Sequence, residues 1–179
     1  MKSFVQYFSF SCLLSITTFG VSANTQDAEA LFDTINQRLS YMKDVGLYKA
    51  QNQLAIENVE RERVVLNSAK TAAAEKGLDA DAVAGFFTAQ ISAAKAIQYR
   101  YRADLLSQPS QRQPLDLTAE IRPALLTLGH SISAQMAAYI AKNGRFKPSQ
   151  RSRFLRIVDQ QYLFKADKQR LFDGLLKIK

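Results

Sequence analysis

Basic side chains interrupt an apolar helical stripe between residues 31 and 52. Residues spaced by three or four positions share one face of a helix, and Arg38 and Lys49 stand on such a face. They are separated by about three helical turns, roughly 16 Å, and Arg61 follows one segment later. A cation that faces a core is costly unless an anion meets it there, so the pattern predicts an internal anion site. The apolar members of the stripe are Leu31, Ile35, Met42 and Val45.

Polar groups stand on two further stripes of the same kind. Gln98 shares a helix face with one apolar stripe, and Arg122 shares a face with another. Glu62, directly after the third cation, adds a hydrogen-bond acceptor. If these helices converge, they form an internal polar pocket that contains cations, an amide and a carboxylate. The apolar members are Phe87, Ile91 and Ala94 on the first stripe, and Leu125, Gly129, Ile132 and Met136 on the second.

Each of these residues also has a plainer interpretation when it is taken alone. A single Arg or Lys on an apolar stripe can extend its charged end to water along its own methylene stem. Gln98 can be a buried amide whose hydrogen bonds the protein itself satisfies, and Glu62 can pair with a base on a neighbouring helix. Periodicity therefore leaves open whether these residues share one site.

Residues 1–23 have the form of a secretory signal peptide, and we expect residues 24–179 to form one domain. Lys2 precedes an apolar run, and Val21-Ser22-Ala23 is a small-residue cleavage signal, so the mature chain should begin near Asn24. The run is too short for a membrane span, which favours export over an uncleaved N-terminal anchor. We therefore expect a periplasmic or secreted protein, with no stable membrane insertion after cleavage.

Cysteine and histidine usage excludes several kinds of chemistry. Cys12 is the only cysteine and would leave with the signal peptide, so the mature chain has neither a disulfide nor a thiol nucleophile. His130 is the only histidine, which argues against a catalytic triad or a His-rich metal centre. We expect His130 to be a surface or hydrogen-bonded residue rather than a ligand.

The net charge of +8 is concentrated at the C-terminal end. Residues 24–141 contain 12 basic and 13 acidic side chains, whereas residues 142–179 contain 11 basic and 3 acidic ones. Such a region can contact an anionic partner, but a solvated helical face is the favoured interpretation. Aromatic residues do not alternate with the basic ones as in nucleic-acid-binding modules, so we expect no nucleic-acid partner.

The chain is predicted to be all-α, a single-domain helical bundle of about six helices with an internal polar pocket. Gly77 ends the second helix, and Asp79 opens the third. Thr118 is the expected cap of the fourth helix, and Pro123 predicts a late or distorted start there. The expected helices span residues 26–52, 57–76, 79–106, 118–142, 148–160 and 166–177.

The order and spacing of several segments resemble one known family. These segments are Ile35–Leu39, Met42–Val45, Tyr48–Lys49, Ile56–Glu57, Arg61–Glu62 and Gln90-Ile91 through Lys95–Asp104. Over about residues 27–136 the chain is similar to the exported, all-helical, gamma-type chorismate mutases. The resemblance implies the pericyclic rearrangement of chorismate, a small dianion, to prephenate, with no covalent intermediate, metal or cofactor.

The same resemblance implies that two residues act on the ether oxygen of chorismate. Lys49 would reach this oxygen together with a carboxylate, and Gln98 would donate to it from the opposite side. Some members carry Glu in place of Gln98, and a Glu must be protonated to donate. Because an amide donates at any pH, we expect activity that stays high at neutral pH.

The remaining residues would bind the substrate. Arg38 and Arg122 would hold carboxylates, because a planar guanidinium binds them with two hydrogen bonds, and Arg61 would support them. Glu62 would accept a hydrogen bond from the ring hydroxyl. A homodimer is compatible with the sequence, although we expect the site to lie within one chain.

Three departures from the family pattern affect this assignment. Asn58 stands where the family often has Asp, which weakens one expected contact near the ring hydroxyl. Ala94 stands where a hydroxyl residue can occur, so a contact there would come from its backbone. Residues 116–122 are one residue longer than a common form of the motif, which affects the register of Arg122.

Two rival interpretations come from other classes of protein. The chain could be an exported helical binding module whose basic C-terminal region holds an anionic partner. It could also be a helical chaperone or adaptor without a small-molecule site. Conversion of chorismate would separate the enzyme from both.

Overall fold

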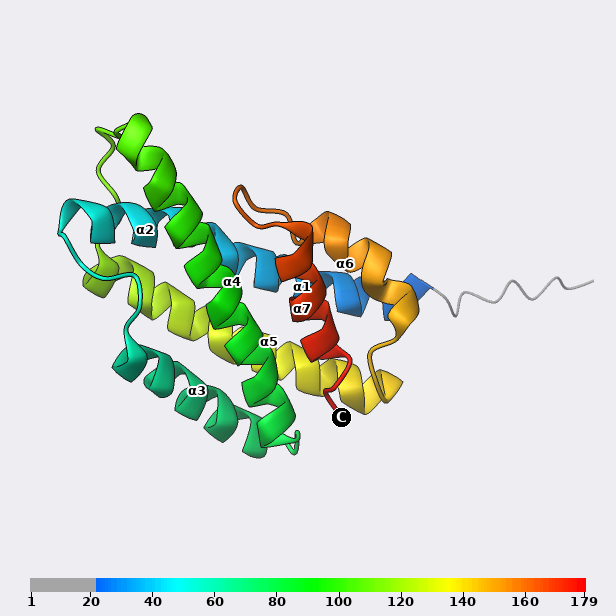
Figure 1. Cartoon of the computed structure of the whole chain (residues 1–179). Helices are drawn as coiled ribbons and strands as arrows, with labels where there is room; N and C mark the ends of the chain where they lie inside the picture. Colours follow the sequence, from blue (N-terminus) through cyan, green and yellow to red (C-terminus); the bar gives the residue numbers. More distant parts are fainter. Residues whose placement is uncertain (1–21) are drawn as a thin grey trace, which may run out of the picture.

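The computed structural model describes residues 22–179, and in this part of the chain all regular elements are helices. The all-α prediction is confirmed, whereas the predicted signal peptide falls almost entirely outside the described residues. The helix α4 runs across the molecule and packs against α2, α3 and α7, whereas α1 packs against α5 and α6 (Figure 1). The α-helices are α1 (Ser22–Ser40), α2 (Met42–Gln51), α3 (Val59–Ala74), α4 (Ala80–Ser107), α5 (Arg122–Asn143), α6 (Arg151–Ile157) and α7 (Lys165–Leu175).

One face of α1 enters the hydrophobic core, and Arg38 lies on that face. Phe32 and Ile35 are fully buried, and Phe32 meets Phe154 of α6 edge-to-face at 5.0 Å between ring centroids. Burial of each such side chain contributes on the order of 2 kcal/mol. Leu39, next to the arginine, is also buried. The packing of these residues therefore orients α1 so that Arg38 points into the protein.

The prediction of one helix over residues 26–52 is wrong, because the chain turns at Tyr41 between α1 and α2. The Ser40 hydroxyl donates to the Gln37 carbonyl at 2.7 Å, and such a bond competes with the helical backbone ladder. The ladder resumes where the Val45 amide donates to the Tyr41 carbonyl at 3.0 Å. Arg38 and Lys49 therefore belong to two separate helices.

Local capping explains where the neighbouring helices begin and end. The Asn58 side chain accepts from the Arg61 amide and caps α3, two residues later than the predicted start at Glu57. Asp79 caps α4 as predicted, because its Oδ1 accepts from the amides of residues 81 and 82 at 3.0 Å. Gly144, with a φ of 79°, ends α5, a backbone conformation that suits glycine.

The start of α5 differs from the prediction. Asp116, and not Thr118, is the cap: its Oδ1 accepts from the amides of Thr118 at 2.7 Å and Ala119 at 2.5 Å. A π-helical turn, Leu117–Ile121, follows, and α5 begins after it with Pro123 in its first turn. The distorted start that Pro123 predicts is confirmed.

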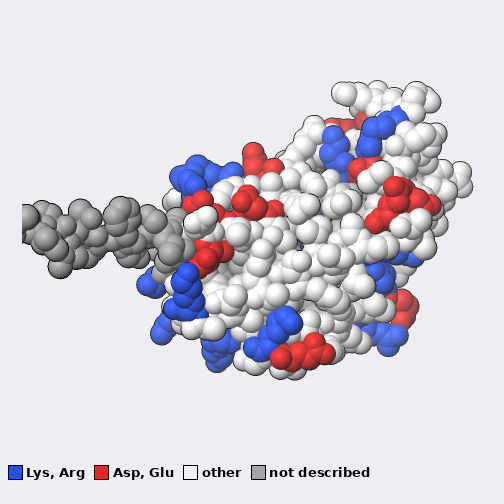
Figure 2. Space-filling view, turned by 180° about the vertical axis from the view of Figure 1, so that it is seen from behind, with Lys and Arg blue, Asp and Glu red and all other residues white. Residues whose placement is uncertain are grey.

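The C-terminal region folds into shorter helices than predicted, and many of its basic residues form ion pairs. A 3₁₀ turn at Pro148–Gln150 precedes α6, and α6 and α7 replace the predicted spans 148–160 and 166–177. The pairs include Arg151–Asp173 at 2.7 Å, Arg153–Glu29 at 2.6 Å, Lys168–Asp159 at 2.6 Å and Lys142–Asp27 at 2.6 Å. These ion pairs favour a solvated helical face for the C-terminal region. On the side of the molecule opposite to the view of Figure 1, shown in Figure 2, basic and acidic side chains also lie near one another.

Candidate functional site

A cavity of about 290 Å³ lies among α1 to α5 and is lined by residues from all five helices. The structure brings every predicted site residue to its wall. The eight residues are Arg38, Lys49, Asn58, Arg61, Glu62, Ala94, Gln98 and Arg122. His130 also reaches the lining and is exposed, in line with its prediction as a surface residue.

Arg38 is a buried cation that has no counter-ion among residues 22–179. It is 5 % exposed, its Nη1 donates to Gln90 Oε1 at 2.8 Å, and its Nε has no acceptor among the described residues. The guanidinium carbon lies 5.8 Å from the centroid of the Phe87 ring. Burial, together with the nearby charge of Arg61, lowers the pKa of Arg38 to about 10. The free protein therefore holds this charge at a cost that a bound anion would relieve.

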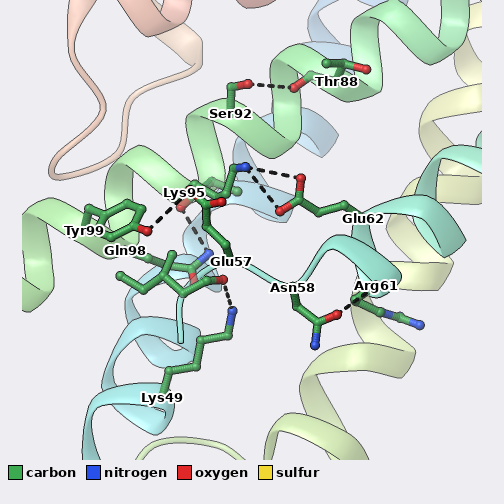
Figure 3. A network of polar contacts seen from close by, with 12 residues as sticks. Lys49, Glu57, Asn58, Arg61, Glu62, Thr88, Ser92, Lys95, Gln98 and Tyr99 are labelled. Carbon is green, nitrogen blue, oxygen red and sulfur yellow. Dashed lines mark hydrogen bonds and ion pairs between the residues drawn. The ribbon is translucent and has the colours of Figure 1, made fainter. Parts of the chain in front are cut away.

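Lys49 stands in the last turn of α2, and its ammonium is held by backbone. The Nζ atom donates to the Ile56 carbonyl at 2.5 Å, as Figure 3 shows. Burial lowers the pKa of Lys49; Glu62 acts in the opposite direction, and the charges of Arg122 and Lys95 lower it further. An ammonium has three donors, so the bond to Ile56 leaves donors for a ligand.

Gln98 is buried in the middle of α4 and presents a partly satisfied amide. Its Nε2 donates to the Ala94 carbonyl at 3.2 Å and contacts the Met42 sulfur at 3.6 Å, while its Oε1 has no partner in the described part of the chain. A Cβ atom on Gly46 would lie 3.4 Å from the Gln98 Cα, so this glycine lets α2 approach α4 closely. The weak thioether contact is one that a ligand oxygen can replace.

The first turn of α3 adds opposite charges to the wall. Because the Asn58 oxygen accepts from the Arg61 amide at 2.8 Å, its amide nitrogen is the group left to donate. Glu62 forms an ion pair with Lys95 of α4 at 3.2 Å, the pairing that the plainer interpretation expected. In Figure 3 the Arg61 guanidinium points away from Lys49. Its positive charge acts on Arg38 instead and lowers the pKa of that residue.

A π-helical turn occupies residues 117–121 of the segment 116–122, which the resemblance predicts to be one residue longer than a common form of the motif. A π turn contains more residues than an α turn, so it can take up one inserted residue without shifting the helix that follows. Arg122, the first residue of α5, lines the cavity, and its Nη1 contacts the Thr118 hydroxyl at 3.4 Å. The register of Arg122 is therefore compatible with the predicted site.

Charge and shape together define what this cavity can bind. Five basic side chains line it against a single acidic one, Glu62, so its interior is strongly positive. Apolar residues complete the wall, which suits a compact ring that carries more than one negative charge. The basic residues are Arg38, Lys49, Arg61, Lys95 and Arg122.

Sequence reasoning missed two polar residues of this region. Gln90 contacts Arg38, and Lys95 contacts Glu62. A signal for Gln90 is present, since it interrupts a second apolar stripe of α4 with alternating spacings of three and four. The pairing of Lys95 depends on how α3 packs against α4, which periodicity does not reveal. The stripe consists of Val83, Phe86, Gln90, Ala93 and Ile97.

Comparison with known proteins shows the family of the chain. The family described as chorismate mutase type II matches residues 27–99. The secreted chorismate mutase of Yersinia pestis is 40 % identical over 81 % of this chain and 78 % of its own length. The monofunctional chorismate mutase of Enterobacter agglomerans is 32 % identical over 99 % and 98 %. The chain belongs to the chorismate mutase family.

A solved structure supports the same assignment at the level of the fold. The crystal structure of the Yersinia pestis protein matches with a TM-score of 0.77, over 83 % of this chain and 96 % of that one.

None of the helices in residues 22–179 has the length and apolar character needed to cross a membrane.

Proposed function

We propose that the cavity is the active site in which this chorismate mutase converts chorismate to prephenate. The observation that carries the proposal is the buried charge of Arg38, which no carboxylate meets among residues 22–179. A dianionic substrate supplies the missing anion. The surrounding excess of basic side chains adds to the attraction.

Positioning is the first task of such a site. The rearrangement needs a flexible diacid held in a chair-like conformer, which removes much of the entropic barrier. Arg38 and Arg122 enter the cavity from α1 and α5 and would each bind a carboxylate through two hydrogen bonds. Arg61 would support them by adding positive charge beside Arg38.

Stabilisation of charge on the breaking ether oxygen is the second task. Lys49 keeps donors beyond the bond to the Ile56 carbonyl, and Gln98 can turn one N–H from the Met42 sulfur to this oxygen. Both groups are already held in place, so little reorganisation is needed as the charge develops.

The ring hydroxyl would meet the polar end of α3. Glu62 would accept from it, while Lys95 holds that carboxylate from α4. Asn58 would add a weaker contact through its amide nitrogen. Ala94 would contribute its backbone, since its carbonyl orients the Gln98 amide.

Turnover is tested by incubating the purified protein with chorismate and following the loss of its ultraviolet absorbance. We expect a chorismate-dependent loss and the appearance of prephenate. The same protein is mixed with vesicles of anionic lipid. Vesicle binding without turnover would favour the rival binding module and overturn the proposal.

We further propose that the protein is exported to the periplasm or the medium and that one chain forms a complete site. The signal-like sequence and the secreted relative support export. Fractionation and N-terminal sequencing should find a mature chain that starts near Asn24. All the lining residues named above come from one chain, so turnover per chain should not depend on whether two copies pair as a homodimer.

A further inference from the structure

Gln90 and Arg38 form a buried polar pair, and each residue keeps one nitrogen that meets no acceptor among the described residues. Gln90 lies fully buried on α4, and its Oε1 accepts from Arg38 Nη1 at 2.8 Å. Two buried nitrogens, Arg38 Nε and Gln90 Nε2, have no partner among the described residues, and both are donors. Buried polar groups are normally satisfied, so the unmet Nε of Arg38, a residue that lines the cavity, indicates a place where an anion is expected.

We propose that Gln90 is a positioning residue that fixes the Arg38 guanidinium for a substrate carboxylate while leaving its positive charge uncompensated. This inference rests on the proposed role of Arg38. The Gln90 amide supplies one acceptor and no charge, so the guanidinium is oriented but not neutralised.

A carboxylate in the same place would have a different effect. Glu at position 90 could form an ion pair with Arg38, and that internal anion would compete with the carboxylate of the ligand. It would also relieve the cost of the buried charge in the free protein. A neutral acceptor therefore favours substrate binding at the expense of stability.

Two substitutions of Gln90 separate orientation from charge. In Gln90→Glu we expect the KM for chorismate to rise at least about 10-fold, with a smaller effect on kcat and a melting temperature at or above that of the wild type. In Gln90→Met, which removes the acceptor that the described residues offer to Arg38, we expect KM to rise and the melting temperature to fall. A purely structural role would make KM follow the melting temperature in both variants.

A matched control lies on the surface. Gln161 accepts from Lys43 Nζ at 2.7 Å outside the cavity, so Gln161→Glu makes the same chemical change beside another cation. Its KM should equal that of the wild type.

Arg38→Ala distinguishes failure of this inference from failure of the proposed site. If Arg38→Ala raises KM but Gln90→Glu keeps the KM of the wild type, the role of Gln90 is overturned. If Arg38→Ala also leaves KM unchanged, the assignment of Arg38 fails first and the inference fails with it.

Discussion

Two buried charged groups in this protein have partners of opposite kinds, charged in one case and neutral in the other. Asp167, at the start of α7, is 2 % exposed and is met by Arg100 at 2.6 Å, Arg170 at 2.5 Å and the Phe164 amide at 3.1 Å. Arg38, in the wall of the cavity, is also buried, but it meets a neutral amide and an aromatic ring.

The difference teaches how a structural charge is told apart from a functional one. The carboxylate of Asp167 is satisfied from three directions, so its removal should damage the fold. The guanidinium of Arg38 meets no carboxylate in the part of the chain that the structure describes, so its removal should damage ligand binding and not the fold. Burial alone does not distinguish the two groups; the nature of the partner does.

The largest expected effect is on turnover, through Lys49, a partly buried cation in the wall of the cavity. Lys49→Ala should lower kcat at least about 100-fold, because it removes a preorganised donor from the ether oxygen, and it should leave the fold intact. Steady-state kinetics with chorismate measures this. Lys43→Ala, on the same helix but outside the cavity, is the control; a preserved rate in Lys49→Ala would remove that residue from the site.

At Asp167 we expect a loss of stability and no loss of turnover. Asp167→Asn keeps the shape of the side chain but loses the charge, which should lower the free energy of unfolding by about 2 kcal/mol. Turnover per folded molecule should not change. Denaturant unfolding and kinetics on the same preparation test this. A stable but inactive Asp167→Asn variant would contradict the distinction between Asp167 and Arg38.

The neutral amide of Gln98 provides a sharper test of the cavity. Gln98→Glu should retain activity at pH 5 and lose about tenfold of it by pH 8, because a Glu donates only when protonated and the wild-type amide donates throughout. Rates of both proteins measured from pH 5 to 8 decide this. Superimposable pH profiles of the two proteins would contradict the proposed role of the Gln98 amide as a donor.

The smallest effect concerns stability in acid. Burial alone would raise the pKa of Asp167, but the hydrogen bonds from Arg100 and the Phe164 amide lower it overall. The stability that this carboxylate contributes is therefore present above the unfolded pKa of about 4 and is lost as pH falls through the lower folded value. The difference in unfolding free energy between wild type and Asp167→Asn should shrink below about pH 4; a constant difference down to pH 3 would exclude this carboxylate as the source.

Much of the fold could be predicted because its signals are local. Asp79 and Gly144 act on the backbone within a few residues of themselves, so the sequence shows them directly. The turn at Tyr41 has no glycine or proline to mark it. The cap at Asp116 was missed because a π turn, and not an α-helical one, opens the segment before α5.

Helix periodicity predicted part of the site. Arg38, Lys49 and Gln98 interrupt apolar stripes and line the cavity as a result. Gln90 interrupts a stripe of α4 in the same way, but its contact with Arg38 of α1 is not visible in the sequence. Lys95 was missed because its pairing with Glu62 arises only once α3 packs against α4.

The most direct test of the contrast is chorismate turnover by the double variant Arg38→Met/Gln90→Leu, with the melting temperature recorded on the same preparation. The lowered pKa of Arg38 shows that the fold disfavours its charge, so its removal with that of its partner should not destabilise the protein. We predict turnover reduced at least about 100-fold, with a melting temperature equal to or above that of the wild type. Retained turnover with a lowered melting temperature, the behaviour expected of Asp167→Asn, would contradict the account.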